Sequence, residues 1–370
     1  MNRYYIETFG CQMNVHESEK LAGLMEERGL VLAPAASEAD VIIFNTCCIR
    51  DTAEKKIEGY IGELKALKRS NPDKILAVTG CMTQQVGRAE ALKKRFPFID
   101  IILGTANQYD ISEKIDELLS LKKRRAQIDI SFCDSPRVRE DVPVCRTSFP
   151  NAWVNIMYGC NNFCTYCIVP YVRGRERSRS KSDILGEIRS LTDKGYAEIT
   201  LLGQNVDSYG SDFKDGTNFY KLLKDISEID GKFRVRFMTS HPKDISEEVI
   251  KIIAETPNFC KNVHLPVQAG SDAVLKAMNR KYTRSRYLEL IDLIRKYMPD
   301  CGITTDVMVG FPGETDADFE DTLDLVERVR FQNAFTFVYS PRAGTPAAHM
   351  EQVAPAVKKE RITRLVALQN

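Results

Sequence analysis

Three cysteines on one short stretch limit most strongly what this chain can fold into. Cys160, Cys164 and Cys167 directly follow an apolar run, residues 153–158, that is typical of a buried strand. Cysteine thiolates are the usual ligands of iron–sulfur clusters. Three of them on one loop can bind three irons of a four-iron cluster and leave the fourth open to a reactant, whereas a fully ligated metal site is structural.

A structural zinc site, or cysteines that only pack, is the alternative interpretation of this loop. Structural zinc usually has four ligands from paired cysteine or histidine motifs. Neither a histidine nor a fourth cysteine stands near residues 160–167 in the sequence. The spacing therefore favours an iron–sulfur cluster with one open iron.

Residues 1–125 alternate between apolar runs and segments with helical periodicity. The apolar runs are typical of buried parallel strands and cover residues 4–9, 41–45, 75–79 and 99–103. The helical segments cover residues 17–28, 52–69, 84–96 and 111–121. This alternation predicts an α/β domain with an open parallel sheet.

Cys11, Cys47 and Cys81 come just after three of these strands. In a parallel sheet the carboxyl ends share one edge, where ligands bind, so we expect these thiols to converge on a second cluster. Three separately buried cysteines are the alternative, because burial is common for cysteine. Cys48 is expected to point away from Cys47 and to pack in the core.

Residues 151–354 repeat the strand–helix pattern six times. The expected strands are residues 152–157, 198–202, 234–240, 262–265, 302–309 and 333–339. The expected helices include residues 183–194, 247–255, 284–297 and 318–328. The repeat predicts a partial barrel, related to the eight-stranded one, with its active-site groups at the carboxyl ends of the strands. His241 and His264 flank such ends, where an acid–base role and a structural role are both compatible with the sequence.

The segment between the domains, residues 126–150, contains several prolines, lacks periodicity and is predicted to be a linker. Just before it, residues 122–125 are lysines and arginines, which suit either a solvated helix end or an RNA contact. Four further cysteines are expected not to bind metal: Cys133, Cys145, Cys260 and Cys301. Residues 355–370 form an expected C-terminal helix.

A basic ribbon follows the cysteine loop. Its arginines are Arg173, Arg175, Arg177 and Arg179. A solvated loop is the default interpretation of such a run. Its position beside a cluster equally suits arginines that bind the phosphates of a nucleic acid, so both interpretations stay open.

The composition is that of an ordinary globular protein. The chain has 370 residues, of which 43% are hydrophobic and 28% charged. The net charge of +1 gives no overall field for a polyanion, so any nucleic-acid contact must use local patches. The sequence contains no apolar run that could span a membrane and no secretion signal. Eleven cysteines in such a chain indicate metal ligation in a reducing compartment, and we expect a cytoplasmic monomer.

The loop Gly159-Cys160-Asn161-Asn162-Phe163-Cys164-Thr165-Tyr166-Cys167 resembles the radical S-adenosylmethionine (SAM) enzymes. The resemblance implies a (β/α)6 partial barrel and a [4Fe-4S] cluster on the three cysteines. Its unique iron would bind SAM, which is cleaved to a 5′-deoxyadenosyl radical. Glycine, amide and hydroxyl groups at the strand ends are suited to ligand contacts. By resemblance we assign the SAM contacts to Gln204, Ser240, Gln268 and Gly310, with Tyr166 over the cluster.

Residues 8–14, 45–50 and 80–81 resemble the N-terminal domain of the methylthiotransferases. The resemblance implies an auxiliary [4Fe-4S] cluster on Cys11, Cys47 and Cys81, whose open iron carries the sulfur to be delivered. The family usually has a small polar residue at the position of Cys48. It also usually continues into a β-barrel RNA-binding domain called TRAM, which we expect to be absent from this chain, after the helix at residues 355–370.

Residues 9–19 and 171–176 look most like the MiaB-type methylthiotransferases. This resemblance implies a reaction that uses two SAM molecules to methylthiolate C2 of N6-isopentenyladenosine at tRNA position 37, with no catalytic side chain beyond the ligands. The implied partners are the anticodon stem-loop, a flavodoxin-like electron donor and a sulfur source, with no membrane. The alternatives are methylthiolation of a ribosomal-protein aspartate or of threonylcarbamoyl-adenosine in tRNA, and more remotely a non-catalytic iron–sulfur carrier.

Overall fold

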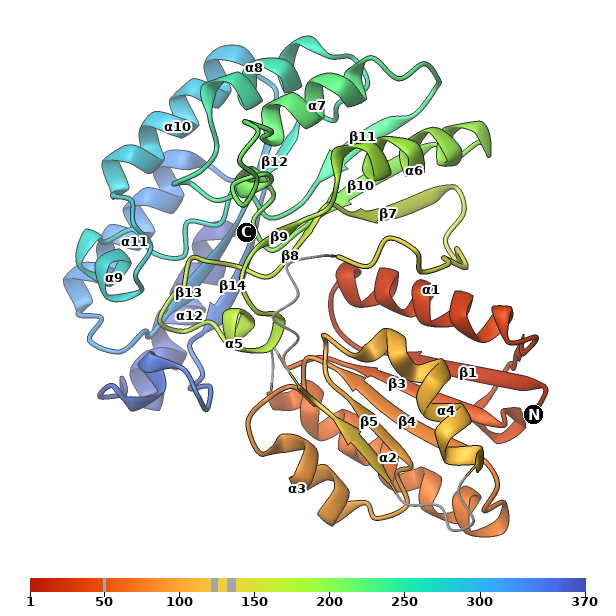
Figure 1. The fold of residues 1–370 in the computed structure, drawn as a ribbon. Helices are drawn as coiled ribbons and strands as arrows, with labels where there is room; N and C mark the ends of the chain where they lie inside the picture. Colours follow the sequence, from red (N-terminus) through yellow and green to blue (C-terminus); the bar gives the residue numbers. More distant parts are fainter. Residues whose placement is uncertain (49–50, 121–125, 132–137) are drawn as a thin grey trace. The chain divides into compact units, whose positions relative to one another are not determined.

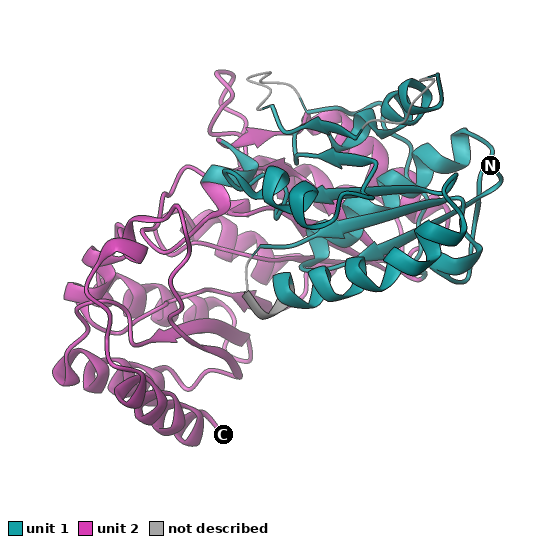
Figure 2. Cartoon of the chain, turned by 90° about the horizontal axis from the view of Figure 1, so that it is seen from below, with its two compact units in different colours: residues 1–149, 171–174 teal, residues 150–170, 175–370 magenta. Residues whose placement is uncertain are grey.

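The computed structural model describes residues 1–48, 51–120, 126–131 and 138–370. By its internal contacts the chain divides into two compact units, which Figure 2 colours separately. Unit 1 contains Met1–Phe149 and Tyr171–Gly174, and unit 2 contains Pro150–Pro170 and Arg175–Asn370. Each unit has its own hydrophobic core.

Unit 1 is a parallel six-stranded sheet with helices on both faces (Figure 1). In sheet order the strands are β2 (Val31–Leu32), β1 (Arg3–Thr8), β3 (Val41–Thr46), β4 (Ile75–Gly80), β5 (Ile101–Leu103) and β6 (Gln127–Asp129). The helices are α1 (Gln12–Glu27), α2 (Asp51–Ser70), α3 (Arg88–Arg95) and α4 (Ile111–Ser120), with 3-10 turns at Ala36–Glu38 and Gln108–Asp110. Helices α1 and α4 contact each other on one face, and α2 and α3 cover the other. All residues of β3 and β4 are therefore buried, as expected for central parallel strands.

The predicted parallel α/β sheet is confirmed, but the structure differs from the prediction in the supposed linker. Strand β6, inside residues 126–150, pairs with β5 from Ile101↔Gln127 to Leu103↔Asp129. Further along, the Cys145 amide donates a hydrogen bond to the Glu19 carbonyl of α1. Part of the supposed linker is thus integral to unit 1. A strand of three residues is too short to show a period of two in the sequence.

Unit 2 is the predicted partial barrel. Its parallel strands are β7 (Asn151–Asn155), β10 (Glu198–Leu202), β11 (Arg234–Phe237), β12 (Asn262–His264), β13 (Gly302–Val309) and β14 (Asn333–Val338). They form two three-stranded sheets, β11-β10-β7 and β12-β13-β14, and a parallel bridge pairs Val235 with Phe259. A short antiparallel pair joins β8 (Met157–Tyr158) to β9 (Arg177–Ser178).

The helices of unit 2 follow the strands in turn. They are α6 (Lys181–Asp193), α7 (Phe219–Ser227), α8 (Glu247–Glu255), α9 (Asp272–Ala277), α10 (Arg284–Tyr297), α11 (Asp316–Val329) and α12 (Pro355–Gln369), with 3-10 turns at Val206–Ser208 and Pro346–His349. Helix α5 (Val169–Arg173) begins in unit 2 and ends in unit 1. Ser246, Thr283 and Thr315 cap the helices α8, α10 and α11 with their hydroxyl groups, which satisfies backbone donors that no carbonyl can reach.

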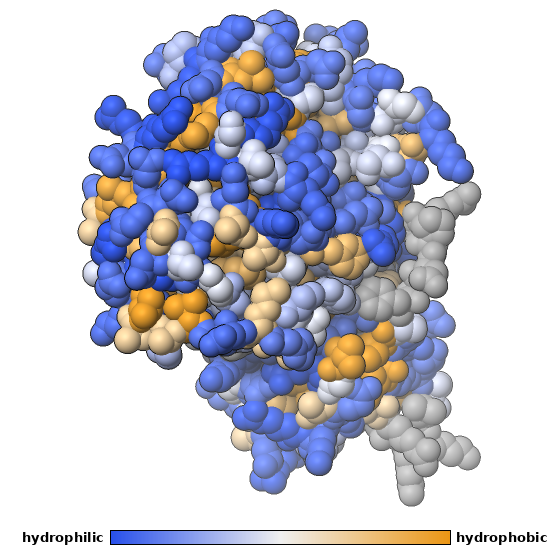
Figure 3. All heavy atoms as spheres, turned by 90° about the vertical axis from the view of Figure 1, so that its left-hand side faces the viewer, coloured by the Kyte–Doolittle hydropathy of each residue, from blue (hydrophilic) through white to orange (hydrophobic). Residues whose placement is uncertain are grey.

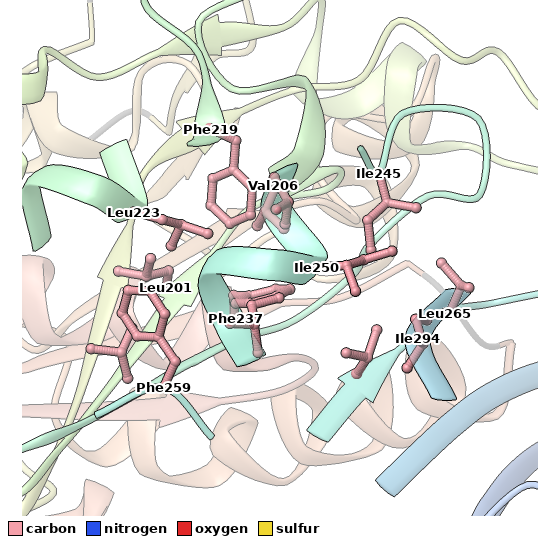
Figure 4. Close-up of a cluster of buried hydrophobic side chains, with 14 of the residues drawn as sticks. Leu201, Val206, Phe219, Leu223, Phe237, Ile245, Ile250, Phe259, Leu265 and Ile294 are labelled. Atoms are coloured by element: carbon pink, nitrogen blue, oxygen red, sulfur yellow. The ribbon is translucent and has the colours of Figure 1, made fainter. Parts of the chain in front are cut away.

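The core of unit 2 lies between the strands and their helices. Figure 4 shows part of it, with Leu201 of β10 and Phe237 of β11 beside Phe219 and Leu223 of α7. Strand β13 alternates strictly between fully buried and half-buried residues. One face of this strand packs against helices, and the other faces the inside of the partial barrel.

The described helices and one face of the surface can be compared with what a membrane-crossing segment requires. Among the residues that the structure describes, no helix combines the length and the apolar character needed to span a bilayer. The face drawn in Figure 3 is mainly hydrophilic, and its apolar side chains form small separate patches.

Gly80, the last residue of β4, supplies a test of the fold. Its φ is +106°, and a Cβ there would lie 2.4 Å from the Thr46 carbonyl oxygen. We expect Gly80→Ala to lower the free energy of unfolding by about 3 kcal/mol, because strain at positive φ adds to overpacking. Urea denaturation of the metal-free protein would measure it.

Gly59→Ala is the matched control for this substitution. Gly59 lies inside α2, and a Cβ there would meet no atom within 4 Å. Alanine is the better helix former by about 1 kcal/mol, so this variant should be slightly more stable. Equal stability of the two variants would contradict the close approach of β4 to β3.

Candidate functional site

The three N-terminal cysteines follow neighbouring strands. Cys47 comes directly after β3, Cys81 directly after β4, and Cys11 three residues beyond the end of β1, at the N-cap of α1. The sheet order β1-β3-β4 makes these strands adjacent. A Cβ on Gly10 would lie 3.0 Å from the Cys47 Sγ, so this side chain rests against the backbone beside Cys11.

Cys48 adds a fourth thiol to the group. It is buried, as predicted, but its thiol donates a hydrogen bond to Cys81. This hydrogen bond and the nearby guanidinium of Arg173 lower the pKa of Cys81 against the effect of burial. The hydrogen bond that Cys48 donates to Cys81, together with burial, raises the pKa of Cys48. The sequence showed that Cys48 departs from the family pattern, but it could not show the contact with Cys81.

Two arginines of the predicted basic ribbon are inside the protein. Arg173 is 8% exposed, and its Nε donates to the Cys81 Sγ at 3.3 Å. Arg179 is 5% exposed and donates to the Asn155 carbonyl oxygen and to Glu187. The expectation that these two side chains present their charge to solvent or to phosphates is therefore wrong, because burial and internal acceptors hold them. Arg175 is exposed, over the ring of Phe163, and Arg177 is half-buried.

The central cysteine loop is held by the segment after α9. The Asn279 side chain donates to the carbonyl oxygens of Asn162 and Phe163, at 3.2 and 3.0 Å. Thr165 is fixed through its amide, which donates to the Met278 carbonyl, and through its hydroxyl, which donates to the Ala277 carbonyl. These hydrogen bonds attach the loop between Cys160 and Cys167 to residues 277–279.

A second buried arginine faces this loop. Arg280 is 5% exposed, and its guanidinium approaches the Cys164 Sγ at 3.5 Å while donating to the Pro266 carbonyl and to the Tyr282 hydroxyl. Burial raises the pKa of Cys160 to about 11 and that of Cys167 to about 12. Metal binding would displace these thiol protons, so ligation is coupled to proton release. The contact of Arg280 with the loop could not be identified from the sequence, because it depends on the tertiary structure.

The spacing of the thiols differs from that around a single metal ion. Across the described ranges, no set of three or more histidine, cysteine, aspartate or glutamate side chains forms a ready ligand set. Of the cysteines predicted not to be ligands, Cys145 donates to Glu26, while Cys260 and Cys301 precede β12 and β13 at the opposite strand ends. Cys133 and the basic residues 122–125 lie outside the described residues.

The residues assigned to SAM all lie at the carboxyl ends of barrel strands. They follow β10 (Gln204), β11 (Ser240), β12 (Gln268) and β13 (Gly310), while Tyr166 packs against the buried cluster that contains Ala269 and Phe311. Among the described residues, five of the six non-glycine residues with positive φ occur in the loops at these ends: Phe163, Thr239, Gln268, Asn279 and Lys281. Strained backbone of this kind gathers at functional sites.

The loops after β10 and β11 share a buried polar contact. The Asp207 carboxylate accepts a hydrogen bond from the His241 amide at 2.8 Å, and burial raises its pKa to about 7. Burial and the charges of Arg280 and Lys243 lower the pKa of His241 to about 2. His241 therefore stays neutral, and its Nδ1 accepts from the Lys243 amide, which favours the structural role for this histidine.

Comparison with known proteins identifies both parts of the chain. Residues 154–326 match the model of the radical SAM superfamily, and residues 3–104 match the uncharacterized protein family UPF0004. The tRNA-2-methylthio-N(6)-dimethylallyladenosine synthase of Thermoanaerobacter pseudethanolicus is 55% identical over 368 residues, which cover 99% of this chain and 78% of that protein. The chain belongs to this synthase family.

Other members of the synthase family are similar to this chain to nearly the same extent. The proteins of the same name from Desulforamulus reducens and Clostridium botulinum are 53% and 52% identical, and the matches cover 80% and 82% of their lengths. Membership of the radical SAM superfamily implies a [4Fe-4S] cluster and SAM. The chemistry of the residues fits both, since three thiols and a buried arginine meet at the loop, and amide and hydroxyl groups lie at the strand ends.

Solved structures support the fold. The radical SAM methyltransferase TsrM from Kitasatospora setae superposes with a TM-score of 0.68 at 13% identity, over 94% of this chain and 75% of that chain. The cobalamin-dependent SAM radical enzyme OxsB gives a TM-score of 0.63 at 13% identity, over 100% of this chain and 56% of that one. At this identity the likeness shows a shared fold alone.

Asp207 gives the site a measurable pH dependence. The folded protein keeps the proton of this carboxyl up to about pH 7, whereas the unfolded chain releases it near its ordinary value of 3.8. The free energy of unfolding should therefore fall as the pH rises through this range. Asp207→Asn, which stays neutral, should gain on the order of 2 kcal/mol over the unmodified chain between pH 5 and pH 8.

Urea denaturation at the two pH values would measure the difference. Asp230→Asn is the control, because this carboxylate is exposed and its loss should leave the pH dependence of the unmodified chain in place. A pH dependence of Asp207→Asn equal to that of Asp230→Asn would show that Asp207 is ionised in the folded protein.

Proposed function

We propose that this chain methylthiolates C2 of N6-isopentenyladenosine at position 37 of tRNA by a radical SAM mechanism. The observation that carries the proposal is the extent of the similarity. Synthases of this modified base share 52–55% of their residues with nearly the whole chain, including the segments that contain both groups of cysteines.

Unit 2 has the groups needed to generate a radical. Cys160, Cys164 and Cys167 would hold a [4Fe-4S] cluster, and with bound SAM this cluster supplies the radical that removes the C2 hydrogen. Arg280 orients Cys164 and offsets the charge of the thiolates. Gly310 has a φ of +70°, and its backbone would approach SAM at the end of β13. The polar side chains at the other strand ends would contact the ribose and amino-acid groups of SAM: Gln204, Ser240 and Gln268.

Unit 1 would supply the sulfur. Cys11, Cys47 and Cys81 would hold a second [4Fe-4S] cluster, which would supply the sulfur destined for the base. Cys11 stands at the N-cap of α1, a helix of 16 residues. A second SAM would methylate this sulfur. A sulfur source and a flavodoxin-like reductant complete the set of partners.

The RNA would be bound through local positive charge. Arg175 is exposed on the ring of Phe163, next to the cysteine loop in the sequence, and Arg177 follows it. Both are proposed to bind phosphates of the anticodon loop. A base in such a loop can be turned out of its stack at modest cost, as radical attack on C2 requires.

The two groups of cysteines should have separable roles. Replacing Cys160, Cys164 and Cys167 by alanine should abolish SAM cleavage. Replacing Cys11, Cys47 and Cys81 should preserve SAM cleavage but stop sulfur insertion. Iron analysis of the reconstituted chain should give about eight irons for two four-iron clusters, and about four in each variant.

Mass spectrometry of an isopentenylated anticodon stem-loop would measure the insertion. Cys260→Ser is the control, since this thiol lies at the other end of the strands. Full methylthiolation by the N-terminal triple variant would disprove the sulfur-carrying role. Activity on a ribosomal protein in place of the RNA would instead favour the corresponding rival.

RNA affinity should depend on Arg175, which is exposed, and on Arg177, which is half-buried. Arg175→Ala and Arg177→Ala should each weaken binding of the stem-loop, and each lost phosphate contact should reduce the slope of log affinity against log salt by about one. Fluorescence anisotropy across a salt series would measure both quantities. Arg189→Ala, at an exposed position of α6, is the control, and equal losses in all three variants would rule out a local phosphate site.

A further inference from the structure

Arg173 lies beside Cys81, one of the three cysteines proposed to hold the auxiliary cluster. It is the last residue of α5 and lies in the short segment, Tyr171–Gly174, that belongs to unit 1. Its Nη2 donates to the Asn14 Oδ1 at 2.6 Å and its Nη1 approaches the Met13 Sδ at 4.0 Å, in addition to the contact between Nε and the Cys81 Sγ. All three nitrogens thus point toward the first turn of α1 and the end of β4.

A buried guanidinium requires negative charge nearby, because burial without compensation is costly. Asn14 and Met13 are neutral, and burial alone would lower the pKa of Arg173. The pKa is nevertheless raised, and the groups that raise it are the sulfur atoms of Cys81 and Cys11 and the carboxylate of Glu17. The contact of the Arg173 Nε with the Cys81 Sγ, at 3.3 Å, places this cation directly beside a proposed ligand of the auxiliary cluster.

We propose that Arg173 is a positioning residue of the auxiliary cluster, which orients Cys81 and offsets the negative charge of the ligand set. The inference rests on the proposed second cluster. Three thiolates bring more negative charge than the oxidised four-iron core has positive charge, and one-electron reduction adds another. A fixed cation at the sulfur favours the reduced form, and net charge and hydrogen bonds to sulfur both set the potential of such clusters.

The proposal gives Arg173 a role different from that of its neighbours in the basic ribbon. Arg175, two positions along, has the same charge but lies on the surface, where solvent and salt screen it. A side chain that only stabilised the fold would leave the potential of the cluster unchanged. The midpoint potential therefore separates electrostatic compensation from simple packing.

The test uses the full chain with Cys160, Cys164 and Cys167 changed to alanine, so that only the auxiliary cluster can form. Into this background we would introduce Arg173→Gln, Arg173→Lys or Arg175→Gln and reconstitute each protein with iron and sulfide without oxygen. Titration with dithionite, followed by electron paramagnetic resonance, gives the midpoint potential. Pulsed spectra in H2O and D2O detect the exchangeable proton that Nε donates to Cys81.

Arg173→Gln should shift the midpoint potential to a more negative value and lose the exchangeable-proton signal. Arg173→Lys should have a midpoint potential close to that of the parent, because the positive charge remains. Its exchangeable-proton signal should change, because the Nε donor is gone. Arg175→Gln should match the parent in both measurements. An unchanged potential and proton signal in Arg173→Gln would overturn the inference, as would equal shifts in Arg173→Gln and Arg175→Gln.

Iron content separates the inference from the proposed function. If the parent protein, the chain with only Cys160, Cys164 and Cys167 changed to alanine, binds no iron, both the proposed second cluster and the inference about Arg173 are wrong. If the parent binds iron but Arg173→Gln does not, while circular dichroism shows it folded, Arg173→Lys decides. Recovery of iron and potential by lysine supports compensation by charge, and failure of a folded Arg173→Lys to bind iron overturns it.

Discussion

Parallel pairing of strands determines where this chain can do chemistry. In the main sheets of both units the strands run in one direction, so the residues that follow them meet at one edge although they are far apart in the sequence. The ladder from β1 through β3 to β4 brings three cysteines to neighbouring positions. The register is well specified, because a slip of one residue would turn the buried side chains of β3 and β4 to the opposite faces.

Each group of thiols is accompanied by one buried arginine. Arg173 contacts Cys81 in unit 1, and Arg280 contacts Cys164 in unit 2. The groups that the two guanidiniums contact include sulfur and the oxygen atoms of carbonyl, amide and hydroxyl groups. Two folds with different topologies therefore meet the same electrostatic requirement in the same way, which argues that the requirement comes from the thiolates they hold.

The sequence predicted the elements with strong patterns and missed those that depend on tertiary contacts. Strands β10 and β13 and helices α8 and α10 begin and end where the periodicity placed them. Helix α1 begins five residues earlier than predicted, because its first turn, at Gln12, is fixed by contacts around Cys11 rather than by apolar spacing.

The positions of the site residues were predictable from their place after the strands, but their environments were not. A run of alternating arginines cannot reveal which members are buried, and only the structure shows Arg173 and Arg179 turned inward. The roles of Asp207 and Arg280 depend in the same way on burial by distant loops. Charge patterns report composition along the chain, whereas pKa shifts come from neighbours in space.

The interleaving of the units limits how this enzyme could be taken apart. A fragment ending at Phe149 would contain the whole six-stranded sheet and its cysteines, but not Tyr171–Gly174. It would therefore lack the guanidinium that accompanies those cysteines. Recombination at residue 149 would join two complete folds, but unit 1 would then lack the positive charge of its own Arg173. The two units can therefore be told apart by their folds, while the cysteines of unit 1 depend on a residue from a later part of the chain.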